Sequence, residues 1–175
     1  MITILPMHIA SVYTPKTENA VLIRVLDPGE KGDAIENPDQ YKAIHRISVH
    51  DNAGFIGRPP GWKNAVLFDE GMASDLVDFV NQYPNTEEWV VHCHAGVSRS
   101  AAVGLSIAWI TEDREAEKAI LQNTTLFPNP HILTVMAHKL SLLPMKQETI
   151  NMFVLGSDAP IIEGPVSLGE LLKED

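Results

Sequence analysis

The chain has 175 residues, of which 45% are hydrophobic and 21% charged, and it carries a formal net charge of −10. This size and composition are typical of a single globular domain with its own core. The negative charge disfavours a general nucleic-acid binder, because such a protein needs a basic face to neutralise phosphates.

The N-terminal segment, residues 1–10 (MITILPMHIA), is apolar but has no basic region before it, and Pro6 interrupts it. It therefore predicts a first strand and not a signal peptide. No apolar run approaches the roughly 18 residues that a membrane-spanning helix needs. The single cysteine excludes an internal disulfide. We expect a cytoplasmic protein with no membrane partner.

Two further strands are predicted before the middle of the chain. Residues 20–27 (AVLIRVLD) are rich in β-branched side chains and run into a Pro-Gly turn, and residues 42–50 alternate loosely. Residues 51–64 contain three glycines and two adjacent prolines, so they predict a long loop. Loops of this length are often functional.

Helices dominate the second half of the chain. In order, the predicted elements are a helix over 69–83, a strand over 88–92, a buried helix over 98–110, and amphipathic helices over 112–123 and 130–143. Pro144 is expected to end the last of these helices. This order predicts one α/β domain, with a mostly parallel or mixed sheet of about four to five strands flanked by helices.

The segment 90–100 (VVHCHAGVSRS) holds the only cysteine, with a histidine on each side and an arginine six positions later. A loop between a strand and a helix N-terminus turns its backbone N–H groups into a common concavity, where the helix dipole adds positive potential. Gly96 permits a tight turn, and the small Ala95 lets the backbone approach a ligand. The segment therefore predicts a cradle for a tetrahedral oxyanion, placed between a strand and a buried helix.

The side chains of this segment suggest distinct roles. Ionisation of a thiol is favoured in such a cradle, so we expect Cys93 to be a thiolate near neutral pH. The guanidinium of Arg99 can bind two phosphate oxygens at once. Ser100 can donate a hydrogen bond to the sulfur, and His92 can orient the loop. We expect no metal or other cofactor, because neighbouring side chains at a strand end point to alternating sides.

The Cys-x5-Arg pattern within HCHAGVSRSAA closely resembles the signature of the cysteine-dependent protein tyrosine phosphatases. It is most similar to their small dual-specificity group, and to its bacterial and phage members. The matching positions are His92, Cys93, Ala95, Gly96, Ser98, Arg99 and Ser100. The likeness covers about residues 20–143, which implies a phosphatase domain over 1–144 and an extension over 145–175 packed on the same domain.

The resemblance implies hydrolysis of phosphotyrosine on a phosphorylated partner protein, through a phosphocysteine intermediate and without a cofactor. Phosphoserine and phosphothreonine are further candidate substrates. It also implies that Asn129, in a Pro-Asn-Pro segment, supports the loop. The residues that would bind the substrate phosphate are His94, Ala95, Gly96, Val97, Ser98 and Arg99.

Such a reaction needs a carboxylic acid to protonate the leaving group. Asp51 ends a predicted strand and begins the 51–64 loop, which is the context of the acid in this family, although the family's acid usually lies nearer the cysteine. Asp69 is the alternative, but an acid at a predicted helix N-terminus is more simply explained as a cap. Asp51 is therefore our expected general acid.

Several alternatives remain open from the sequence. The same chemistry could act on a phosphoinositide, a nucleotide or an RNA 5′-phosphate, and a phosphate-binding module without catalysis is a further possibility. His94 could contact substrate or lie in solvent. Within the 51–64 loop, Arg58, Trp62 and Lys63 could line the substrate or simply be solvated. The sequence does not give the oligomeric state.

Overall fold

The computed structural model describes residues 1–52 and 54–154. Its centre is a four-stranded sheet in the order β1-β4-β2-β3, and all neighbouring strands are parallel. The strands are β1 (Ile2–Pro6), β2 (Ala20–Leu26), β3 (Ala43–Ser48) and β4 (Glu88–Cys93). The carboxyl ends of parallel strands meet at one edge, which is where such sheets bind ligands.

The two central strands, β2 and β4, are mostly apolar, which suits the middle of the sheet. β2 (AVLIRVL) is buried at every position but Arg24, and β4 (EWVVHC) is buried throughout. Continuous burial of this kind is typical of parallel strands covered on both faces.

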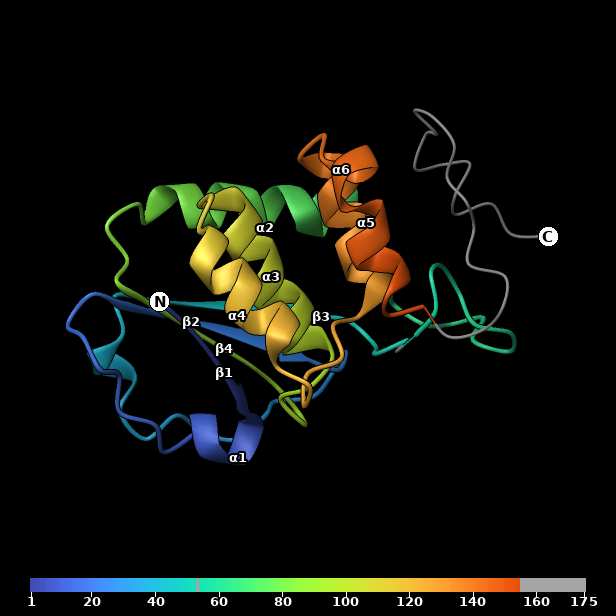
Figure 1. The fold of residues 1–175 in the computed structure, drawn as a ribbon. Helices are drawn as coiled ribbons and strands as arrows, with labels where there is room; N and C mark the ends of the chain where they lie inside the picture. Colours follow the sequence, from blue (N-terminus) through green and yellow to red (C-terminus); the bar gives the residue numbers. More distant parts are fainter. Residues whose placement is uncertain (53, 155–175) are drawn as a thin grey trace.

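Helices cover the two faces of the sheet unequally. The short α1 (Met7–Ala10) lies on one face, and the longer helices form a layer on the other (Figure 1). The helices of that layer are α2 (Glu70–Gln82), α3 (Arg99–Ile110), α4 (Arg114–Gln122), α5 (Pro130–Lys139) and α6 (Leu143–Asn151). A 3₁₀ turn, η1 (Pro38–Gln40), precedes β3. Our prediction of a single α/β domain with a mostly parallel or mixed sheet of about four to five strands is confirmed, and the sheet is wholly parallel.

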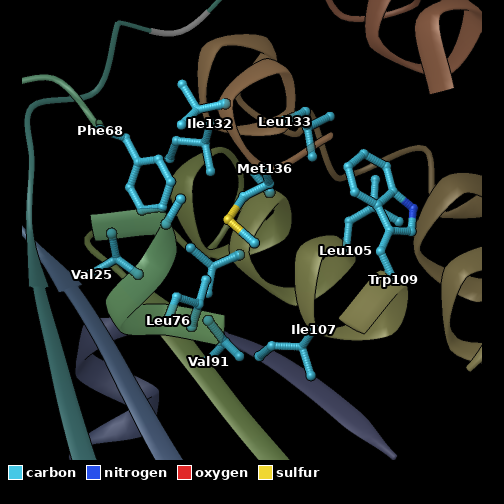
Figure 2. Close-up of a cluster of buried hydrophobic side chains, with 14 of the residues drawn as sticks. Val25, Phe68, Leu76, Val91, Leu105, Ile107, Trp109, Ile132, Leu133 and Met136 are labelled. Carbon is cyan, nitrogen blue, oxygen red and sulfur yellow. The ribbon is translucent and has the colours of Figure 1, made fainter. Parts of the chain in front are cut away.

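The main core lies between the sheet and this helical layer. Figure 2 shows Val25 of β2 and Val91 of β4 directed at Leu76 of α2, Ile107 of α3 and Met136 of α5. α3 is buried at every position from Arg99 to Trp109, as its apolar sequence predicts. The buried α3 begins at the carboxyl edge of the sheet, so its first turn is fixed relative to the strand ends.

The expected end of α5 at Pro144 is wrong. α5 ends at Lys139, and Ser141 has left-handed backbone with φ of 58°. Pro144 instead lies in the first turn of α6, where proline loses no hydrogen bond. The expected boundary between residues 144 and 145 therefore falls inside a helix.

α6 contacts the rest of the domain through Ile150 and the nearby Phe153, which are buried in the main core. The remainder of the expected C-terminal extension, residues 155–175, lies outside the described residues. Across the part of the chain that the structure covers, no helix combines the length and apolar character of a membrane span.

Candidate active site

The 93–99 loop joins the end of β4 to the start of α3, as predicted. It lies against the turn from β1 to α1, where the Met7 N–H donates to the His94 carbonyl at 3.1 Å. Gly96 has φ of 73°, and a Cβ at this position would lie 2.5 Å from Pro6 N and 2.6 Å from Leu5 C. Both the backbone conformation and the lack of space therefore require glycine at position 96.

Gly96→Ala should accordingly disrupt the loop. The left-handed backbone costs an alanine about 1–2 kcal/mol, and overpacking against main-chain atoms adds about 1–3 kcal/mol. We expect a lower urea midpoint together with weakened binding of orthovanadate. The matched control is Gly29→Ala, at a glycine with φ of 83° but no atom within 4 Å of the added Cβ. Equal losses of stability and of vanadate binding in the two variants would show that the contact with β1 is unimportant.

Cys93 lies at the bottom of the loop and is 2% exposed. Its Sγ is 3.2 Å from Ser100 Oγ. The backbone N–H groups of residues 95–98 donate to no partner among the described residues. The sulfur is thus close to a hydroxyl, at the base of a loop whose amides are available to an anion.

Arg99 is buried, and one end of its guanidinium is anchored. Nη1 donates to Asp27 Oδ1 at 2.9 Å and to the Val49 carbonyl at 2.8 Å. Nε is also buried but has no hydrogen-bond partner within residues 1–52 and 54–154. A buried donor without a partner is costly, so this N–H marks a place where an acceptor on a ligand would be stabilising.

Asp27 was missed by the sequence analysis. It directly follows β2, the neighbour of β4 in the sheet, and so reaches the same edge as Cys93. An acidic residue immediately after a buried strand was the available signal. Its proximity to the 93–99 loop can be recognised only when the strand order is known.

Asp51 lies beside the loop, where the sequence analysis expects the acid. Its Oδ1 accepts hydrogen bonds from Ser98 Oγ and Asn129 Nδ2, both at 2.8 Å. Its Oδ2 is 3.7 Å from Arg99 Nε, close enough for an ion pair but not for a hydrogen bond. One oxygen therefore anchors the carboxyl group, and the other faces the space next to Arg99.

Asn129 supports this arrangement through Asp51 more than through the 93–99 loop itself. Its Oδ1 caps α5 by accepting from His131 N and Ile132 N, while its Nδ2 also donates to Asn52 Oδ1. Its backbone N–H donates to the Ser98 carbonyl of the loop. The same side chain thus fixes the start of α5 and the position of Asp51.

His131 ties the middle and the end of the segment between β3 and α2 to α5. Its Nδ1 accepts from Gly57 N at 3.0 Å, so the remaining ring proton lies on Nε2, which donates to the Phe68 carbonyl at 2.9 Å. Burial lowers the pKa of His131 to about 4. The neutral ring makes both bonds, whereas a proton on Nδ1 would remove the bond to Gly57.

This histidine makes stability depend on pH. The pKa in the folded protein is below the ordinary value of about 6.5, so the unfolded chain binds the proton first as pH falls. The contribution is complete above about pH 6.5 and is lost progressively toward pH 4, up to about 3 kcal/mol. We expect the free energy of unfolding in urea to fall over this range, and less so in His131→Gln. If the free energy of unfolding fell as steeply with pH in His131→Gln as in the wild type, His131 would not be the group responsible.

His92 and His94 flank Cys93 but differ in surroundings. His92 is fully buried, whereas the His94 side chain is 70% exposed, with Nδ1 3.9 Å from Glu30 Oε1. Ala95 and Val97 are exposed as well. The outward side chains of the loop are therefore His94, Ala95 and Val97, and none carries a permanent positive charge.

The structure gives the surroundings of Arg58 and Trp62, two residues of the 51–64 loop whose role the sequence analysis left open. Arg58 Nη1 donates to the carbonyls of Trp62, Lys63 and Ala65, so its guanidinium holds the loop together. Trp62 is partly exposed and lies edge-on to His50, beside a hollow of about 520 Å³.

Asp69, the alternative acid, is the N-cap of α2. Its Oδ1 accepts from Met72 N at 2.9 Å. This is the simpler explanation that the sequence favours for it.

The comparisons with known proteins concern the fold. No protein-family model and no curated protein sequence matches the chain. The structure of PTPMT1 in complex with PI(5)P superposes with a TM-score of 0.54 and 15% identity, covering 84% of this chain and 94% of PTPMT1. Human DUSP28 superposes with a TM-score of 0.53 and 15% identity, covering 83% of this chain and 94% of DUSP28.

The chain has the protein tyrosine phosphatase fold. The resemblance inferred from residues 92–100 is confirmed at this level. Identity of 15% establishes the fold and not the reaction or its substrate, because one fold can host many functions. The function must be argued from the site.

Proposed function

We propose that the protein is a cysteine-dependent phosphatase that hydrolyses phosphotyrosine on proteins. The observation that carries the proposal is the buried Nε of Arg99, which has no hydrogen-bond partner among the described residues and is located at a loop whose amides at 95–98 likewise have none there. Donors without a partner beside a cysteine suit the oxygens of a phosphoryl group.

In the first step, the Cys93 thiolate attacks phosphorus and forms an S–P bond as the P–O bond to the tyrosine breaks. Arg99 Nε and the loop amides would hold the non-bridging oxygens. Nη1 of Arg99, bound to Asp27 and Val49, fixes the plane of the guanidinium. Orientation of this kind lowers the barrier without any movement at the moment of reaction.

The departing phenolate oxygen takes a proton from Asp51. The anchored Oδ1 fixes the carboxyl group, and Oδ2 is the oxygen on the side of Arg99. In the second step, the Asp51 carboxylate removes a proton from water as the water attacks phosphorus and the S–P bond breaks. Ser100, 3.2 Å from the sulfur, donates to the departing thiolate.

The surroundings of the loop favour an aryl phosphomonoester over a lipid headgroup with additional anionic groups. Asp27 and Glu30 lie beside the loop, and its outward side chains supply only His94 as a potential cation. Further negative charge on a substrate would be repelled there. The rival class is the phosphoinositides, since PTPMT1 was crystallised with PI(5)P. Nucleotides and RNA 5′-phosphates carry the same electrostatic penalty.

A substrate panel tests the proposal. We expect kcat/KM to be highest for a phosphotyrosine peptide, lower for the matched phosphothreonine peptide, and lowest for short-chain PI(5)P. Glu30→Gln should raise the relative rate for PI(5)P, because it removes one negative charge and keeps an oxygen for Asp27 N. A preference for PI(5)P in the wild-type protein would establish the rival class. Binding of phosphopeptide without turnover would establish a non-catalytic module.

A further inference from the structure

Three polar side chains form a row across the sheet on the α1 side. Arg24 of β2 is the register partner of His92 of β4 on one side and of Arg46 of β3 on the other. Side chains alternate between the faces of a strand, so these three share a face with the apolar Leu22 and Val90. His92, one member of the row, immediately precedes the 93–99 loop.

Arg24 is held at both ends of its guanidinium. Nε donates to His92 Nε2 at 3.2 Å, and Nη2 donates to the Asp33 carbonyl at 2.6 Å. The chain that follows β2 lies on top of it, because a Cβ at Gly32 would be 2.7 Å from Arg24 Nη2. Arg24 therefore has little freedom to point elsewhere.

This contact determines the protonation of His92. A guanidinium donates hydrogen bonds and cannot accept them, so Nε2 of His92 must be the acceptor. The single proton of the neutral ring then lies on Nδ1, which is 3.5 Å from the Cys93 carbonyl oxygen. Burial lowers the pKa of His92 to about 4, the hydrogen bond to the Cys93 carbonyl opposes it, the Arg24 charge lowers the pKa further, and Asp33 and Glu30 raise it.

We propose that Arg24 is a positioning residue of the phosphatase reaction, acting through His92. By donating to Nε2, Arg24 selects the tautomer that carries its proton on Nδ1. That N–H points to the Cys93 carbonyl and orients the first peptide group of the 93–99 loop, whose amides face the phosphate. The catalytic part of this inference rests on the proposed function, whereas the tautomer does not.

The tautomer can be measured without any substrate. Long-range ¹H–¹⁵N NMR at pH 7 should show His92 with its proton on Nδ1 in the wild-type protein. In Arg24→Met, signals from the other tautomer should appear, because Nε2 has lost its donor. The matched control is Arg46→Met, which removes the neighbouring cation but leaves the Arg24–His92 contact. An Nε2-protonated ring in the wild type, or an unchanged spectrum in Arg24→Met, would overturn the inference.

A double-mutant cycle tests the effect on catalysis. The Asn side-chain amide can take over the donor position of Nδ1, so His92→Asn should make Arg24 dispensable. We expect Arg24→Met to lower kcat/KM on an aryl phosphate by about tenfold or more in the wild-type background, and by less than about threefold in His92→Asn. Arg24→Gln, whose amide can still donate to His92, should recover part of the loss.

The outcomes separate the two proposals. Equal losses in both backgrounds would mean that Arg24 acts by packing alone, which overturns the inference while leaving the phosphatase intact. A wild-type protein with the expected tautomer but no hydrolysis would overturn the proposed function instead. Urea midpoints of all variants, compared with Arg46→Met, identify any variant whose loss reflects poor folding.

Discussion

Replacing Cys93 with serine should abolish phosphatase activity while preserving phosphopeptide binding. A serine hydroxyl is not ionised near neutral pH, so the attack on phosphorus loses its nucleophile. We expect kcat to fall by at least about four orders of magnitude, as for other enzymes that lose a nucleophile. The amides at 95–98 and Arg99 remain in place, so calorimetry should still detect binding of a phosphotyrosine peptide.

Arg99→Lys is the companion variant. Lysine keeps the positive charge but cannot contact Asp27 and the Val49 carbonyl through one nitrogen while presenting another to phosphate. We expect kcat to fall by about 100- to 1,000-fold, with weakened vanadate binding.

Turnover above about one hundredth of the wild-type rate in Cys93→Ser would show that another residue is the nucleophile.

Asp51→Asn should produce a loss that depends on the leaving group. The asparagine oxygen can still accept from Ser98 and Asn129, so the loop geometry is retained while the transferable proton is removed. For phenyl phosphate, whose leaving group needs protonation, we expect a loss of about 100-fold or more. For an activated fluorogenic aryl phosphate, the loss should be much smaller.

The control for this experiment is Asp69→Asn. Asparagine caps helices as well as aspartate does, so stability and activity should both be preserved. A normal rate on phenyl phosphate in Asp51→Asn would exclude Asp51 as the acid. If the loss appeared in Asp69→Asn, the acid would lie at the start of α2.

The sequence was most informative where the site is local. Cys93, Gly96, Arg99 and Ser100 lie within one strand–loop–helix unit, so their spacing alone predicts their proximity. The apolar and alternating segments likewise predict the four strands, although the first predicted strand also took in residues 7–10, which form α1. Asp51 could be placed only with the help of the resemblance, since its contacts with Ser98 and Asn129 join distant segments.

The contacts that hold the site together could not be predicted in the same way. Asp27 meets Arg99, and Arg24 meets His92, only because β2 lies next to β4 in a parallel register. A single sequence contains no signal for this strand order. Pro144 was misplaced for a local reason, because proline is equally acceptable after one helix and in the first turn of the next.

Asn129 both caps α5 and holds Asp51, and this restricts how the protein could be given a new substrate specificity. Replacing Asn129 would remove the cap of α5 together with a hydrogen bond that holds Asp51, so changes at this side chain would damage the scaffold along with selectivity. The side chains at 94, 95 and 97 are exposed and cap no helix. Laboratory libraries that aim to retarget the protein should therefore be restricted to those three positions.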